Sequence, residues 1–356
     1  MTNTIQGPDE FTADLANKVL GRHLPAAVES LQINPLGEGV GLMSAIARAK
    51  LQLEDGSEQT VIVKYIAQTE NAAISKGLNF YANELNFYQH LATNCPIPSP
   101  RCLFAELDAE TQDFLLILED LGDGVAGNQL ESCSRSVMAK AFQKAGEMHA
   151  QYWQKIATWD WPSYHNDPER NIFRRDAIYQ PGVEPTLKLF PSYFTGNLED
   201  CVREIGNRFP ELFERAMSAP GTFIHGDYRT DNMLLPGNPD DPEIVAVDWQ
   251  NSGGGSGTHD IAYFSSQSCG EELRGEIELT ELKNYHQALM DGGVQDYSFE
   301  QCLEHYRLNL LITMITPIAV CGTLDPGNER GMALGEVMLS RSLAALKTME
   351  CDQLLF

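Results

Sequence analysis

The chain has 356 residues, an apolar fraction of 43% that is ordinary for a globular protein, and a formal net charge of −25 at pH 7. This negative charge argues against nucleic acid or an anionic membrane as the main partner. Three explanations of the charge stay open: solubility alone, steering of a cationic substrate, or a salt-rich cytoplasm. The eight cysteines include no C-x-x-C pair, which leaves zinc ribbons and redox motifs without support and is typical of reduced thiols in a cytoplasmic protein.

The distribution of charged and apolar residues along the sequence predicts no targeting segment and no membrane segment. The first residues, MTNTIQGPDEF, lack the basic and apolar regions of a signal peptide. The longest apolar run, residues 308–322, is too short to span a bilayer and contains Pro317. We therefore expect a cytoplasmic protein in which this run forms a buried helix; the pattern predicts no oligomeric state.

The first third of the chain is rich in predicted strands. Residues 43–53 and 60–66 alternate between apolar and polar side chains, and the turn-forming segment EDGSE joins them, so we expect two paired strands. Residues 79–92 have helical periodicity, and the short apolar run 114–118 indicates a buried strand.

After residues 119–120 the pattern becomes mainly helical. Helices are expected at 134–155 and 198–218, then two short strands within 232–249, then helices to the end. The order predicts an α+β protein with two lobes. We expect a small N-lobe with an antiparallel sheet at 1–118, a hinge at 119–124 and a larger, mainly helical C-lobe at 125–356.

Two charged residues of the first third stand on apolar faces. Lys64 shares a face of its strand with Ile62 and Ile66, where an ammonium group is unfavourable unless an anion meets it. Glu84 lies on a helical stripe with Tyr81 and Tyr88. The two side chains would satisfy each other as an ion pair; the alternatives are a lysine on an edge strand that reaches water and a glutamate at the margin of its stripe.

Three glycines, Gly37, Gly39 and Gly41, precede the first predicted strand pair. Glycine lets backbone N–H groups approach a phosphate closely, so this segment is a candidate phosphate-covering loop. The spacing matches neither a Walker loop nor a clean G-x-G-x-x-G motif, and a plain tight turn explains it equally well.

The most specific stretch is FIHGDYRTDNMLL, residues 223–235. Asp227 has a carboxylate that can orient a hydroxyl group and take its proton. Asn232 and Asp248 offer the hard oxygen atoms that Mg²⁺ accepts beside phosphate oxygens. If 232–235 and 244–249 pair as a hairpin, Asn232 and Asp248 come to the same end of it. A positioned metal beside a positioned nucleophile is the arrangement that phosphoryl transfer needs.

H-G-D-x-x-x-x-N, followed by an apolar strand and D-W-Q, resembles the aminoglycoside and choline phosphotransferase superfamily, whose fold is protein-kinase-like. In chain order, the stretches LILEDL, AGEMHAQYW, FIHGDYRTDNMLL, VAVDWQ and HDIAYF resemble its ecdysteroid-kinase-like branch. The resemblance runs from about Leu36 to about residue 270. It implies an enzyme that uses ATP and Mg²⁺ to phosphorylate a hydroxyl group of a small molecule, and the acceptor stays open.

The resemblance also implies roles for single residues. Asp227 would be the catalytic base, Asn232 and Asp248 the Mg²⁺ ligands, and Lys64 the residue that holds the α- and β-phosphates with Glu84 as its partner. His225 would brace the catalytic loop, and the three glycines would cover the phosphates. The segment Leu118–Leu121, which includes Glu119, would be the hinge that offers backbone groups to adenine.

Four further features allow two interpretations each. Arg229 would contact the transferring phosphate or form a salt bridge within its own loop. Asp260 would be a helix N-cap or would tie back to the catalytic loop. His149 would be a packing residue or a catalyst, and packing is the simpler interpretation. Residues 159–176 would shape the acceptor pocket or form a packed loop.

Two other function classes compete with a kinase. One is a degenerate kinase that binds a nucleotide or metabolite without transferring phosphate, although Lys64, Glu84, Asp227, Asn232 and Asp248 are all present. The other is a metal-dependent phosphohydrolase, for which the chain has few clustered acids and histidines.

Overall fold

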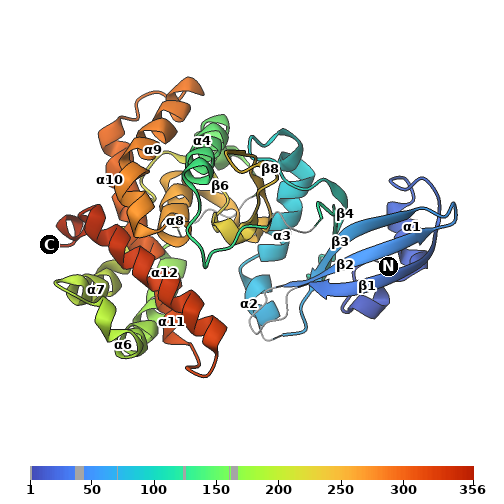
Figure 1. The fold of residues 1–356 in the computed structure, drawn as a ribbon, viewed down its shortest axis with the longest axis horizontal. Coiled ribbons are helices and arrows are strands. Elements are labelled where there is room, and N and C mark those ends of the chain that lie inside the picture. The colour runs from blue at the N-terminus through green and yellow to red at the C-terminus, as the bar shows by residue number, and fades with distance from the viewer. Residues whose placement is uncertain (1, 37–43, 70, 123–125, 160, 162–166) are drawn as a thin grey trace. The chain divides into compact units, whose positions relative to one another are not determined.

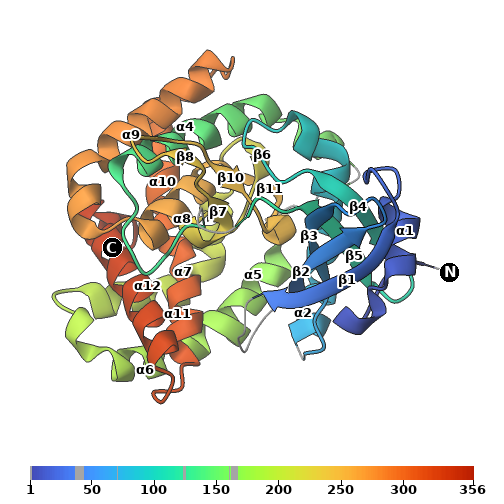
Figure 2. The ribbon, with the colours of Figure 1, turned by 45° about the vertical axis from the view of Figure 1, so that its right-hand side comes forward.

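The computed structural model describes the chain except for residues 1, 37–43, 70, 123–125, 160 and 162–166 (Figures 1 and 2). The chain divides into two compact units. The first comprises Met1–Gly124 together with Val247–Asn251, and the second comprises Val125–Ala246 and Ser252–Phe356. Five residues from late in the chain therefore pack with the first unit.

The first unit is built on a five-stranded antiparallel sheet (Figure 2). The predicted pair of strands is confirmed, since β2 and β3 are antiparallel neighbours, and Lys64 of β3 lies opposite Ile46 of β2 and Leu116 of β5. The strand order is β1 (Val28–Leu36), β2 (Ser44–Leu53), β3 (Glu58–Ile66), β5 (Phe114–Glu119) and β4 (Cys102–Leu107).

One face of this sheet carries the apolar core of the first unit. Val61, Val63 and Tyr65 of β3 point into it and pack with buried side chains of helix α1 (Ala13–Leu20). Because side chains alternate across a strand, Lys64 lies on the opposite face. Alternation thus separates the lysine from the main core.

The helix predicted at 79–92 is present and has two parts. It begins as α3 (Phe80–Asn86) and continues as the π-helical turn η2 (Phe87–Leu91). Its predicted stripe is buried, with Tyr81, Glu84 and Tyr88 each no more than 5% exposed. The short helical elements η1 (Pro8–Glu10), α2 (Asn71–Gly77) and η3 (Ala92–Asn94) complete the first unit before its second segment, which contains η8 (Trp249–Asn251).

The second unit is mainly helical, as predicted. Helix α8 lies among α4, α10 and α12, and its side chains are almost all buried (Figure 1). The helices are α4 (Arg135–Tyr152), η4 (Ile156–Thr158), α5 (Pro168–Phe173), η5 (Arg174–Tyr179), α6 (Gln180–Leu189), η6 (Pro191–Tyr193), α7 (Leu198–Ala216), η7 (Thr230–Asn232), α8 (Thr258–Ser268), α9 (Glu271–Asp291), α10 (Phe299–Thr313), α11 (Ile315–Gly322), α12 (Glu329–Thr348) and η9 (Cys351–Leu354).

The described residues of this unit also form three short antiparallel ribbons. The expected pairing of the segments around 232–249 is confirmed, because β7 (Met233–Leu234) pairs with β10 (Val245–Ala246). Asn232 directly precedes β7, and Asp248 follows β10 by two residues. The other ribbons pair β6 (Gly221–Ile224) with β11 (Gly253–Ser256), and β8 (Gly237–Asn238) with β9 (Asp241–Pro242).

The glycine-rich run 252–257 contains strand β11. Its glycines allow close contact with the neighbouring strand, because a Cβ atom on Gly255 would lie 2.7 Å from the Cδ1 atom of Ile224. Glycine at this position therefore leaves room for the side chain of Ile224.

The apolar run 308–322 is helical, but it forms two helices and not one. Helix α10 ends at Thr313 and α11 begins at Ile315, with Pro317 in the first turn of α11, where a missing backbone N–H group is tolerated. Among the helices that the structure describes, none has the length and apolar character needed to cross a membrane.

Candidate active site

Lys64 forms salt bridges with two carboxylates within the first unit. Its Nζ atom lies 2.6 Å from Oε2 of Glu84 and 2.6 Å from Oδ1 of Asp248. The side chains of Lys64 and Glu84 are 8% and 1% exposed, whereas that of Asp248 is 30% exposed. The expected pairing of lysine and glutamate is confirmed, and the alternatives of a water-exposed lysine and glutamate are excluded.

Asp248 reaches Lys64 because the segment around it is fixed to helix α3 and turn η2. The Trp249 ring stacks on Phe87 with 3.7 Å between ring centroids, and the carbonyl of Gln250 accepts a hydrogen bond from Asn83 at 3.4 Å. Asp248 itself has a φ of 63°, in the left-handed region that aspartate tolerates better than most residues. The carboxylate therefore projects from a sharply turned backbone.

The three charges shift one another's pKa values. Burial raises the pKa of Glu84 to about 7, although the Lys64 cation acts in the opposite direction. Burial alone would lower the pKa of Lys64, but Asp248 and Glu84 together outweigh it and raise that pKa. We conclude that Lys64 stays charged and that Glu84 takes up a proton more readily than an exposed glutamate.

A Glu84→Gln variant tests this pKa. The pKa of Glu84 rises from 4.5 to about 7 on folding, so the stabilisation from its proton is complete below pH 4.5 and is lost as the pH rises to about 7. Relative to the variant, the wild type should lose up to about 3 kcal/mol of unfolding free energy from pH 5 to pH 8. Urea unfolding at both pH values measures this change. A constant difference would show that Glu84 is ionised throughout the range.

In the second unit, the loop that follows β6 is fixed by Asp260. The carboxylate of Asp260 accepts hydrogen bonds from the backbone N–H groups of His225, at 2.8 Å, and Gly226, at 2.9 Å. Gly226 has a φ of 80°, so the turn favours glycine at this position. His225 is fully buried, and its Nδ1 atom accepts a hydrogen bond from the N–H group of Asp227 at 3.3 Å.

These hydrogen bonds decide between the two expected roles of Asp260 and between those of His149. Helix α8 begins at Thr258 after Gly257, so Asp260 is not its N-cap and instead ties back to the loop. His149 is fully buried, with Nε2 3.2 Å from Asp260 and Nδ1 3.0 Å from the hydroxyl of Tyr285. Burial alone would raise the pKa of Asp260, but His149 and neighbouring histidines lower it, so Asp260 is ionised. His149 thus has a structural role.

Asp260→Ala should destabilise the protein by about 3 kcal/mol or more. The change leaves the N–H groups of His225 and Gly226 and the buried ring of His149 without their acceptor, at about 1 kcal/mol or more each. Thermal unfolding measures the loss. Asp291→Ala, an exposed acid at the end of α9, is the matched control and should change stability by about 0.5 kcal/mol or less. Equal stability of the two variants would contradict this role of Asp260.

Asp227 is held from both sides within the same loop. Its Oδ1 atom lies 3.1 Å from Nε of Arg229, and its Oδ2 atom accepts a hydrogen bond from Nδ2 of Asn232 at 2.8 Å. The amide of Asn232 also donates to the backbone carbonyl of Asp227 at 2.9 Å. The Asp227 side chain remains 13% exposed. Arg229 therefore forms the salt bridge within the loop that was one of its two expected roles.

Sequence patterns did not reveal two residues beside this loop. Tyr263 of α8 is 5% exposed and hydrogen-bonds to Asp227; burial of its ring and then the Asp227 carboxylate raise its pKa. Gln129 is fully buried and accepts a hydrogen bond from Nη1 of Arg229 at 2.6 Å. Tyr263 lies within HDIAYF, but the motif gave it no role, and Gln129 belongs to none of the quoted motifs, so only the folded structure reveals these contacts.

The remaining predicted site residues lie in the first unit. Gly37, Gly39 and Gly41 are outside the described residues. Glu119 ends β5, and its backbone N–H group donates to the carbonyl of Arg101 at 2.9 Å. Leu121 is 40% exposed.

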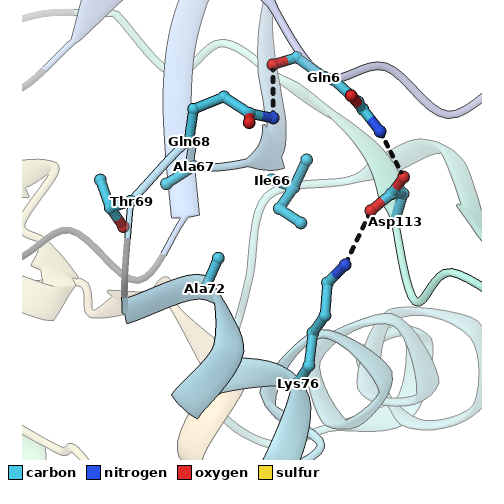
Figure 3. Close-up of a pocket in the computed structure, with 8 residues that line it drawn as sticks. All are labelled: Gln6, Ile66, Ala67, Gln68, Thr69, Ala72, Lys76 and Asp113. Atoms are coloured by element: carbon cyan, nitrogen blue, oxygen red, sulfur yellow. Dashed lines mark hydrogen bonds and ion pairs between the residues drawn. The ribbon is translucent and has the colours of Figure 1, made fainter.

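A pocket of about 530 Å³ in the first unit contains none of the predicted site residues (Figure 3). Asp113 accepts hydrogen bonds there from Nε2 of Gln6 at 2.9 Å and from Nζ of Lys76 at 3.0 Å. Burial would raise the pKa of Asp113, but these two donors hold it below its usual value. The side chains of Gln6, Lys76 and Asp113 in this pocket are therefore linked to one another by hydrogen bonds.

The fold agrees with solved structures of low sequence identity. The chain is 13% identical to a putative aminoglycoside phosphotransferase from Ralstonia eutropha JMP134, with coverage of 93% and 96% of the two chains and a TM-score of 0.53. A variant of aminoglycoside 2'-phosphotransferase-IIIa in complex with GDP is 13% identical, with coverage of 94% and 98% and a TM-score of 0.55. Spectinomycin phosphotransferase, in complex with ADP and spectinomycin, is 11% identical, with 96% and 97% coverage and a TM-score of 0.51.

At these identities the structures establish the fold alone, which is the protein-kinase-like fold expected from the sequence. A comparison with curated protein sequences found no match. The model of the ecdysteroid kinase-like family matches residues 38–296, which is more than half of the chain and includes Lys64, Asp227 and Asp248. The chain therefore belongs to the ecdysteroid kinase-like family.

Proposed function

We propose that the protein is an ATP- and Mg²⁺-dependent phosphotransferase that moves the γ-phosphate to a hydroxyl group of a small molecule. The arrangement around Asp227 is the observation that carries the proposal. A carboxylate oxygen accepts more than one hydrogen bond, so the contacts to Arg229 and Asn232 orient Asp227 and leave it room to accept another proton donor. Its partial exposure gives a substrate hydroxyl access.

In the proposed reaction the acceptor oxygen forms a bond to the γ-phosphorus as the bond from that phosphorus to the β–γ bridging oxygen breaks. Asp227 orients the hydroxyl and takes its proton, and ADP leaves. Arg229, already beside Asp227, would bring a positive charge close to the transferring group. The protein thus contributes mainly position and charge.

The residues present fit Mg²⁺ and a nucleotide. Asn232 uses its amide nitrogen within the loop, so its carbonyl oxygen would serve as a ligand, and Asp248 would supply a partly exposed carboxylate. Bound Mg²⁺ would neutralise charge on the phosphates. Lys64 would bind the α- and β-phosphates, with Glu84 keeping it in place and charged.

The other assignments follow the same proposal. Gly37, Gly39 and Gly41 would cover the phosphates, and the backbone of Glu119 and Leu121 would contact adenine. Residues 1–118 would act as the nucleotide-binding lobe, 119–124 as the hinge and 125–356 as the lobe that carries the catalytic loop and acceptor site. A cytoplasmic location would supply ATP and keep the eight thiols reduced.

The related proteins leave the nucleotide and the acceptor open. Similar structures have been solved with GDP and with ADP, and one of them contains spectinomycin. We favour ATP from the sequence resemblance and assign no single acceptor.

Thermal unfolding with nucleotides tests the proposed binding site. Ligands that bind only the folded state raise its melting temperature, so ATP with Mg²⁺ should stabilise the wild type. Asp248→Ala should remove the Mg²⁺-dependent part of this shift, whereas Asp240→Ala, an exposed control in the second unit, should retain it.

A further shift with one hydroxyl compound from a metabolite panel would identify the acceptor class. Absence of any shift with ATP or GTP would contradict the proposed nucleotide site. A nucleotide shift without phosphate transfer would instead favour the degenerate kinase that acts as a binding module.

A further inference from the structure

Gln129 connects the loop around Asp227 to the C-terminal helix α12. It is fully buried, and each of its four polar atoms has a partner within the second unit. Its backbone N–H group donates to Oδ1 of Asp231 at 2.6 Å, and its backbone carbonyl accepts from Nη1 of Arg341 at 2.7 Å. Its side-chain Nε2 atom donates to Oε1 of Gln267 at 3.3 Å. The backbone of Gln129 is therefore fixed independently of its side chain.

The remaining atom of this side chain, Oε1, contacts Arg229. It accepts a hydrogen bond from Nη1 of Arg229 at 2.6 Å, while the other side of the same guanidinium faces Oδ1 of Asp227 at 3.1 Å. A planar guanidinium that is held at one edge presents its other edge in a defined direction. The position of Gln129 thus determines how Arg229 meets Asp227.

The Gln267 contact also fixes the orientation of the Gln129 amide. Since Nε2 of Gln129 donates to Gln267, the carbonyl oxygen is the atom that points to Arg229. Gln267 is held in turn, because its Nε2 atom donates to Oγ of Ser342 at 2.8 Å and its backbone carbonyl accepts from Arg341 at 2.8 Å. The chain of contacts runs from α12 through α8 to the loop.

We propose that Gln129 is a positioning residue for the transfer step, which acts through Arg229 to orient the carboxylate of Asp227. This inference rests on the proposed function, because it gives Gln129 a role in the reaction that Asp227 performs. Gln129 itself touches no reacting atom. Asp227 contacts Arg229, Asn232 and Tyr263, and Gln129 controls Arg229, the only long and otherwise adaptable side chain of these three.

Gln129→Leu tests the proposal, with Gln267→Leu as its matched control. Both changes remove the bond between the two glutamines, but only Gln129→Leu removes the acceptor for Arg229. Displacement of a catalytic group can lower the rate up to about 10²-fold, so we expect Gln129→Leu to lower kcat roughly 10- to 100-fold with the nucleotide KM nearly unchanged. Gln267→Leu should leave kcat within about twofold, and Gln129→Glu, which retains an acceptor oxygen, should restore most of the rate.

A double-mutant cycle with Arg229→Met separates positioning from general damage. Once Arg229 is gone, Gln129→Leu should cause no further loss of kcat. Equal losses with and without Arg229, or equal losses in Gln129→Leu and Gln267→Leu, would overturn the proposal. If the wild type transfers no phosphate, the proposed function fails. The same double-mutant cycle, measured on the free energy of unfolding, then decides whether the side chains of Gln129 and Arg229 are coupled. Additive losses of stability would overturn the inference.

Discussion

Asp227→Asn is expected to bind nucleotide like the wild type and to transfer phosphate roughly 10³-fold more slowly. An amide has nearly the shape of the carboxylate but cannot take the proton of the acceptor hydroxyl. The amide oxygen would still accept one hydrogen bond, and the backbone carbonyl at this position would still hold Asn232. Steady-state kinetics on the purified variant measure the loss, with a nucleotide thermal shift to show that the site is intact.

Asp231→Asn is a demanding control for this experiment, because it lies in the same loop and accepts a hydrogen bond from the backbone of Gln129. Its amide oxygen retains that bond, so kcat should stay within a few-fold of the wild type. Asp227→Asn with wild-type turnover would remove Asp227 from its assigned role and leave the family membership untouched.

Lys64→Met is expected to cost about 3–5 kcal/mol of stability, because it leaves two carboxylates together without their shared cation. The same change should abolish the nucleotide-dependent thermal shift, since the cation proposed to bind the α- and β-phosphates is gone. Urea unfolding measures the first effect and thermal unfolding with ATP and Mg²⁺ the second.

Two further variants locate the cause of that loss. Lys50→Met, on the neighbouring strand, removes an ion pair whose side chains are 48% and 52% exposed, so it should cost about 0–1 kcal/mol. Lys64→Met combined with Glu84→Gln removes the uncompensated charge of Glu84 and should recover part of the stability. Similar losses in Lys64→Met and Lys50→Met would show that the buried cluster is not the cause.

Local periodicity was sufficient to predict the pairing of Lys64 with Glu84. Alternation placed the lysine on one face of a strand, and helical spacing placed the glutamate among aromatic side chains, so an ion pair was one of the interpretations beside contact of each group with water. The turn-forming segment between 43–53 and 60–66 likewise predicted β2 and β3. In each case the signal lies in the local pattern of a single element or of two elements joined by a short turn.

Contacts between distant segments could not be predicted in this way. Nothing in the local pattern indicates that Asp248 packs with the first unit, which depends on the stacking of Trp249 on Phe87. Gln129 and Asp260 each contact the loop around Asp227 from far away in the sequence, and the glycine-rich run 252–257 gave no periodicity by which to recognise β11. The sequence could identify the reactive groups, and the resemblance gave the tie from Asp260 to the loop as one of two roles, but the contact of Gln129 with Arg229 needed the folded structure.

The most direct measurement is phosphate transfer itself. Wild type and Asp227→Asn would be incubated with Mg²⁺, ATP labelled at the γ-phosphate and a panel of small hydroxyl compounds, and the labelled products would be separated and identified by mass spectrometry. We expect a labelled phosphomonoester with the wild type and roughly 10³-fold less of it with the variant. Transfer at equal rates by both proteins, or no labelled ester from any hydroxyl compound when nucleotide binding is intact, would contradict this expectation.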